Sequence, residues 1–169
     1  MTLLAAVGVA RSLSRVCGLN PEIKWPNDIL IGQKKIAGIL TEMEGQDDRI
    51  AFVVLGIGLN VHSRLKELPE GATSVREEVG ERVSRVVLAR ALLSELDDLY
   101  GQSLREGFEK ILTEWRQRSQ TLGRRVSVQC SGRQVEGQAM DIDATGALLI
   151  RNDQGFIEPI HAGDILLIR

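Results

Sequence analysis

The sequence lacks the features that mark several large classes of protein. It has two cysteines, Cys17 and Cys130, and neither belongs to a Cys-x-x-Cys pair, which argues against a disulfide scaffold and a zinc site. Its formal net charge is −2, so it has no excess of positive charge for nucleic acid or an anionic membrane. No apolar stretch is long enough to span a bilayer. We therefore expect a cytoplasmic protein with no nucleic-acid or membrane partner.

Common catalytic signatures are missing as well. We interpret the two histidines, His62 and His161, as surface or capping residues, because no nucleophile or metal-ligand residues accompany them at a suitable spacing. The chain has no P-loop, and the segment around Gly56 and Gly58 lacks the third glycine of a dinucleotide-binding fingerprint. The residues on their own assign no metal ligand.

The first part of the chain has the pattern of a helix followed by a meander of strands. Apolar residues at helical spacing predict a core helix over residues 2–17. Strand-like segments separated by turn residues predict an antiparallel sheet beneath it, with strands at 22–25, 28–31, 34–44 and 49–61. The last segment is apolar almost throughout, which is typical of a central strand covered on both faces. A hairpin turn is predicted at residues 45–48.

The rest of the chain divides into a helical part and a second β-rich part. We predict a polar surface loop over 62–80 and helices over 81–100 and 103–117. From Leu122, about five short strands with turns between them indicate a small SH3-like barrel, and we predict these strands at 124–130, 133–141, 147–151, 156–160 and 164–168. The expected architecture is α+β, with a mixed or antiparallel sheet and packing helices in residues 1–121 and the barrel in residues 122–169.

The densest group of chemically useful residues is Lys24-Trp25-Pro26-Asn27-Asp28, which falls at a corner between two strands. Proline and the two Asx residues could serve the turn alone. A purely structural corner does not require Lys24, whose ammonium could neutralise a phosphate or carboxylate. The corner is therefore a candidate site for an anionic ligand.

Glycines inside the predicted strands form the second candidate feature. Gly38, Gly56 and Gly58 weaken strands that otherwise carry bulky residues, so each needs a reason, such as a bulge or the close approach of a ligand. Asn60 ends its strand, where its amide could contact a nucleotide or form a local turn. Lys35 begins another strand and could be either a solvated turn residue or part of a site.

Three ordered motifs together resemble those of the biotin protein ligase family. They are Lys24-Trp-Pro-Asn-Asp28, Lys35-Ile-Ala-Gly-Ile-Leu40 and Gly56-Ile-Gly-Leu-Asn-Val61. The segments Leu122-Gly-Arg-Arg-Val-Ser-Val128, Gly146-Ala-Leu-Leu149 and Gly163-Asp-Ile165 resemble the small C-terminal domain of the same family. The tryptophan and proline of the first motif favour the biotin branch over a lipoate-attaching relative. The resemblance implies a class II synthetase-like ligase domain followed by an SH3-like domain.

The resemblance also implies a reaction and roles for the residues. The family joins biotin to ATP to give biotinyl-adenylate, with Mg²⁺ expected, and passes biotin to a lysine of a biotin carboxyl carrier protein. Lys24 matches a lysine between the biotin carboxylate and the α-phosphate, and Lys35 matches a second lysine near the site. The remaining matched binding positions are Asn27, Asp28, Gly38, Gly56, Gly58 and Asn60.

One departure from the family affects the expected activity. The Gly/Arg-rich loop that covers the adenylate in the family has no counterpart here, so we expect an N-terminally truncated ligase domain with weak or no activity by itself. The alternative is a non-catalytic binding or oligomerisation module derived from such a ligase, in which open sheet edges would favour a homodimer.

Overall fold

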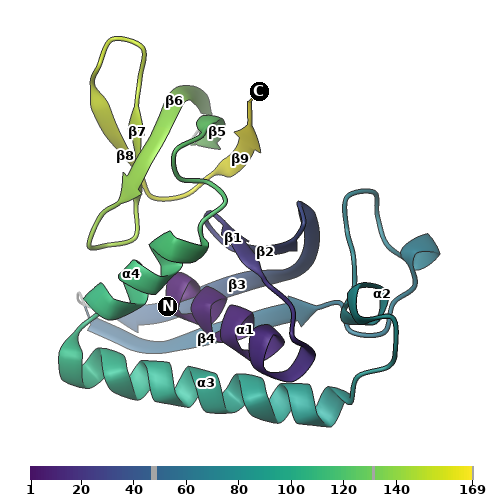
Figure 1. The fold of residues 1–169 in the computed structure, drawn as a ribbon. Helices are drawn as coiled ribbons and strands as arrows, with labels where there is room; N and C mark the ends of the chain where they lie inside the picture. The colour runs from purple at the N-terminus through teal and green to yellow at the C-terminus, as the bar shows by residue number, and fades with distance from the viewer. Residues whose placement is uncertain (47–48, 131, 169) are drawn as a thin grey trace.

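The computed structural model describes residues 1–46, 49–130 and 132–168, which form two antiparallel sheets and a group of helices (Figure 1). The first sheet has the strand order β1-β2-β3-β4, with β1 at Glu22–Lys24, β2 at Asp28–Ile31, β3 at Lys34–Gln46 and β4 at Arg49–Leu59. This meander confirms the predicted α+β class. Gly45 and Gln46 pair with β4 and so belong to a strand, whereas the rest of the turn predicted at 45–48 lies outside the described residues.

Helix α1 (Thr2–Cys17) lies between the first sheet and the other long helices. Every residue from Leu4 to Ala10 is buried, as expected for a helix that contacts neighbours on all sides. The helix ends at Gly18, which takes a left-handed conformation with φ 65° and donates its N–H to Ser14 O. The helix predicted at 2–17 is therefore confirmed at both ends.

The prediction of a central strand at 49–61 is wrong for the described chain. Strand β4 pairs only with β3, and Ile50, Phe52 and Val54 on one of its faces are 65%, 52% and 50% exposed. On the other face, Leu55 and Ile57 pack against the core. Apolar residues on both faces of β4 made burial of both faces plausible, but the described helices cover only one face of the strand.

Residues 62–80 are more ordered than the predicted loop. They contain a short 3-10 helix at Leu65–Glu67 and helix α2 at Val75–Val79. The Ser74 side chain accepts a hydrogen bond from the Glu77 N–H, so Ser74 caps α2. Thr73 and Ser74 are fully buried, which ties this segment to the core.

The break between the two long helices lies later than predicted. Helix α3 runs over Arg85–Glu106 and continues through Gly101, whereas α4 covers Glu109–Arg118. One glycine inside a helix costs only about 1 kcal/mol relative to alanine, and the packing of α3 on α1 tolerates it. The chain turns instead at Gly107, with φ 77°.

The C-terminal part forms a five-stranded antiparallel sheet in the order β8-β7-β6-β5-β9. All five strands lie close to the predicted positions, and their bounds are β5 at Arg125–Cys130, β6 at Arg133–Ile142, β7 at Leu148–Arg151, β8 at Ile157–Ile160 and β9 at Asp164–Leu167. Among the described strands no pairing joins β8 to β9, so the barrel and the boundary at 121/122 stay predictions.

Trp25 joins the two parts of the chain. Its indole Nε1–H donates to Gly146 O at 3.1 Å, and its backbone N–H donates to Thr121 Oγ1 at 3.0 Å. Asp143 accepts hydrogen bonds from the Thr145 hydroxyl and nearby backbone N–H groups, which lower the pKa of its carboxyl and shape the turn that presents Gly146. The C-terminal sheet is thereby fixed beside the Lys24–Asp28 corner.

Cys17 and Cys130 are free thiols. Within the described ranges, no helix is both long enough and apolar enough to cross a bilayer.

Candidate functional site

Four of the residues singled out in the sequence form one row across the first sheet. Lys24 pairs with Asp28, Asp28 with Gly38, and Gly38 with Gly58, so the row crosses β1, β2, β3 and β4. Residues directly opposite each other in an antiparallel sheet share one face. The row therefore has a cation and a carboxylate at one end and two glycines, which have no side chain, at the other.

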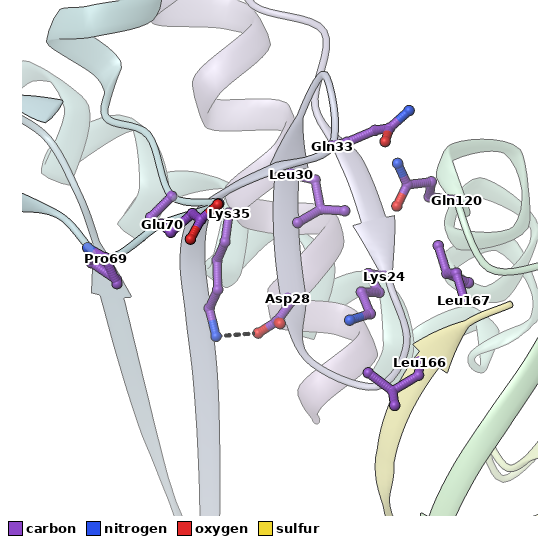
Figure 2. Close-up of a pocket in the computed structure, with 12 residues that line it drawn as sticks. Lys24, Asp28, Leu30, Gln33, Lys35, Pro69, Glu70, Gln120, Leu166 and Leu167 are labelled. Atoms are coloured by element: carbon purple, nitrogen blue, oxygen red, sulfur yellow. Dashed lines mark ion pairs between the residues drawn. The ribbon is translucent and has the colours of Figure 1, made fainter. Parts of the chain in front are cut away.

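The charged end of the row opens into a pocket of about 360 Å³. Lys24, Asp28 and Lys35 all line it, and Figure 2 shows Asp28 between the two lysines. The Lys35 Nζ lies 2.6 Å from Asp28 Oδ1, which satisfies the charge of both groups. Among the described residues Lys24 has no ion pair, so its ammonium is available to an anion.

The glycine end of the row is open. A Cβ added at Gly56 or Gly58 would come no closer than 3.7 Å or 3.8 Å to the protein, which is ordinary van der Waals contact. Packing within the chain therefore does not require glycine at either position. A Cβ at Gly38 would lie 3.2 Å from the Lys35 side chain, so Gly38 leaves room for that lysine to reach Asp28. Gly56 and Gly58 therefore form an open strip on which a ligand could approach the backbone, next to the Lys35 side chain that lies over Gly38.

The two asparagines of the predicted site brace the backbone in this structure. The Asn27 amide donates to Ile39 O at 2.8 Å, and the Asn60 amide donates to Thr73 O at 3.1 Å. Asn27 thereby ties the corner after Lys24 to β3. Asn60 fixes the segment before α2 at the end of β4. Neither lines the pocket at Lys35, although Asn27 lines a smaller cavity next to Lys24.

The pocket also has walls that the sequence did not reveal. Residues 69–72 form one wall, because the Lys35 N–H donates to Gly71 O at 2.8 Å and Lys35 O accepts from Thr73 N–H at 2.8 Å. Gln120, Leu166 and Leu167 form the opposite wall. No local motif marks these residues, since they come from segments more than thirty residues away from Lys35 in the sequence.

Comparison with known proteins gives the same family over both parts of the chain. Residues 2–60 match the Biotin/lipoate A/B protein ligase family, and residues 121–167 match the Biotin protein ligase C terminal domain. The Biotin--[acetyl-CoA-carboxylase] ligase of Paracoccus denitrificans is 30% identical over 162 residues, which cover 92% of this chain and 68% of the relative. The chain belongs to the biotin protein ligase family.

A longer member shows how much of the family's length is shared. The Bifunctional ligase/repressor BirA of Bacillus subtilis is 35% identical over 171 residues, covering 99% of this chain and 52% of the relative. The chain thus spans about half the length of that ligase.

The fold agrees with that of a solved biotin protein ligase. The structure of the biotin protein ligase from Aquifex aeolicus in complex with biotin and ATP superposes with a TM-score of 0.83 at 25% identity. The match covers 99% of this chain and 70% of the Aquifex chain. The arrangement of both sheets and the helices is therefore that of the family.

Proposed function

We propose that this chain provides a biotin and ATP site of a biotin–[acetyl-CoA-carboxylase] ligase. In the first step, a biotin carboxylate oxygen attacks the α-phosphorus of ATP, the bond to the β-phosphate breaks, and pyrophosphate leaves. In the second step, the amine of a lysine on a biotin carboxyl carrier protein attacks the acyl carbon. An amide forms, and AMP and a proton are released.

The row from Lys24 to Gly58 is the observation that carries this proposal. Adenylation brings a carboxylate and a phosphate together, and their repulsion must be offset by fixed positive charge. Lys24, which has no ion pair among the described residues, supplies that charge at one end of the row, and the ammonium of Lys35, paired with Asp28, lies in the same pocket. The glycine strip at the other end leaves the backbone exposed, so the fused rings of biotin can pack against it.

The two lysines have different surroundings and therefore different proposed roles. Lys35 is held by Asp28, so its ammonium has a fixed position and suits the orientation of the reacting carboxylate. Lys24 has no ion pair among the described residues and suits the phosphate. Asn27 and Asn60 act on the site indirectly, because their amides fix the strands and loop that carry it.

A magnesium ion with ATP is compatible with the pocket. The carboxylates of Asp28 and Glu70 both line it, and no group of three or more potential ligands occurs among the described residues. Magnesium commonly uses one or two carboxylates together with substrate phosphates and water. When bound, the ion would neutralise phosphate charge.

Calorimetric titration tests the proposal directly. Biotin and a non-hydrolysable biotinyl-adenylate analogue would be titrated into the chain and into a Lys24→Ala variant, with the exposed Lys66→Ala variant as the control for loss of a lysine. We expect the analogue to bind and Lys24→Ala to weaken it about 10- to 100-fold, the usual effect of losing a hydrogen bond to a charged group. A folded wild-type chain that binds neither compound would refute the proposal.

A binding or oligomerisation module is the second candidate, and one observation favours it. A groove of about 680 Å³ runs beside the free edge of β4, with Ile50, Phe52, Leu93 and Tyr100 among its lining residues. Exposed edges of this kind pair readily with another strand. Light scattering on the chain at increasing concentration tests the oligomerisation module, since a homodimer would double the measured mass and a monomer at all concentrations would exclude self-association. The cytoplasmic location stays a prediction.

A further inference from the structure

Gln120 is a buried polar residue in the connection between α4 and β5. Its backbone N–H donates to Ile23 O at 2.9 Å, and the neighbouring Ser119 forms a parallel bridge with Ile23. The connection therefore lies beside β1, next to Lys24. Gln120 is only 4% exposed, so most of its side chain is enclosed by the protein.

The side chain of Gln120 points into the pocket at Lys24. Figure 2 shows its amide directed toward the space between Leu30 and Lys24, with Leu167 of β9 beside it. Within the described part of the chain this amide makes no side-chain hydrogen bond. Its polar atoms stay accessible from the pocket and can take water or a ligand as their hydrogen-bond partner. A ligand in this pocket would supply that partner.

The surroundings of Gln120 favour a phosphate group as the partner. Lys24 adds a positive charge on the same side of the pocket, and a glutamine amide has two N–H donors. The described lining residues include no aromatic ring on which a nucleobase could stack. An ammonium and an amide donor together match phosphate oxygens.

The position of Gln120 relative to the row indicates which phosphate it contacts. The row begins at Lys24 on β1 and ends at Gly58 on β4. Gln120 lies on the outer side of β1, away from the glycine strip. If biotin lies over the glycines and the α-phosphate lies at the lysines, the part of ATP that reaches Gln120 is the β,γ-diphosphate.

We propose that the Gln120 carboxamide donates a hydrogen bond to the β- or γ-phosphate of ATP and, with Lys24, holds the pyrophosphate as it leaves. This assignment rests on the proposed function, because it takes ATP as the ligand of the pocket. It assigns to the α4–β5 connection a direct part in the site.

Titration calorimetry with three ligands tests the assignment. Inorganic pyrophosphate, ATP and the biotinyl-adenylate analogue would be titrated into the wild-type chain, Gln120→Leu, Gln120→Glu and Gln117→Leu. Gln117 is exposed in the last turn of α4, shortly before Gln120, so its variant is the matched control. We expect Gln120→Leu to weaken pyrophosphate and ATP about tenfold or more, and Gln120→Glu to weaken them further by charge repulsion. Binding of the analogue, which has no β- or γ-phosphate, should stay unchanged.

The ligands separate a failure of this assignment from a failure of the proposed function. Equal weakening of all three ligands would show that Gln120 supports the fold of the pocket and would overturn the assignment. Binding of the analogue without any effect of Gln120 on pyrophosphate or ATP would overturn the assignment alone. Binding of pyrophosphate that depends on Gln120, without binding of the analogue, would support a diphosphate site and refute the ligase proposal. A folded chain that binds none of the ligands would refute both.

Discussion

Replacing Gly56 or Gly58 with alanine should separate ligand binding from stability. A methyl group at either position would meet the protein at ordinary van der Waals distance, 3.7 Å or 3.8 Å. Glycine in a strand is less stable than alanine by roughly 0.5–1 kcal/mol. We therefore expect the free energy of unfolding to stay the same or to rise by up to about that amount.

The same methyl groups should harm binding. They would project from the glycine strip into the space that biotin is proposed to occupy, and inserting a methyl into a packed contact costs about 1–3 kcal/mol. This cost corresponds to a weakening of roughly 5- to 150-fold in the dissociation constant of the biotinyl-adenylate analogue. Urea unfolding and calorimetry on the same samples would measure both effects.

Gly137 provides the contrasting control. A Cβ at this position would overlap the carbonyl oxygen of Arg151, so alanine should destabilise the C-terminal sheet by about 1–3 kcal/mol or more. The reasoning about the glycine strip would be refuted if the Gly56 and Gly58 variants bound the analogue as tightly as the wild type. It would also be refuted if they lost as much stability as the Gly137 variant.

Two further perturbations test contacts that stabilise the fold. Trp25→Phe removes the donor to Gly146 O, so the unfolding free energy should fall by about 1–3 kcal/mol in urea titrations, and no change would exclude a role for this hydrogen bond. Glu114 is partly desolvated, yet hydrogen bonds from Arg11 and Arg118 lower the pKa of its carboxyl below 4.5. A lowered native pKa stabilises the fold above the unfolded pKa, and the effect is lost as pH falls through the native value. Glu114→Gln should therefore reduce the melting temperature at pH 7 and have a smaller effect below about pH 4, and a difference independent of pH would contradict this sign.

Local turn and strand signals were sufficient to place most of the sheets. The turn at Gly32 and Gln33 adopts positive φ values of 52° and 72°, as a tight hairpin requires. Short alternating segments after Leu122 placed all five strands of the second sheet close to their observed bounds. These features depend on a few neighbouring residues, so the sequence contains the information directly.

The helix break and the α2 segment show two limits of such signals. Gly101 and Gly107 are both glycines, so the residue type does not tell which of them ends the helix. Helix α3, which packs against α1, continues through Gly101 and ends before Gly107. The sequence Ser74-Val-Arg-Glu77 did contain a capping signature for α2. The polar composition around it concealed the signal, because a five-residue helix has too few positions to show periodicity.

The candidate site was predictable as a set of residues and unpredictable as an arrangement. The motifs identified Lys24, Asp28, Gly38 and Gly58, but nothing local determines that these four lie opposite one another. Their alignment depends on register, which the corner at 25–27 and the later turns set together. Because side chains alternate between the faces of a strand, a shift of one residue in any of these pairings would move part of the row to the helix-covered face. The lengths of the connections are therefore as important to the proposed chemistry as the lysines and glycines themselves.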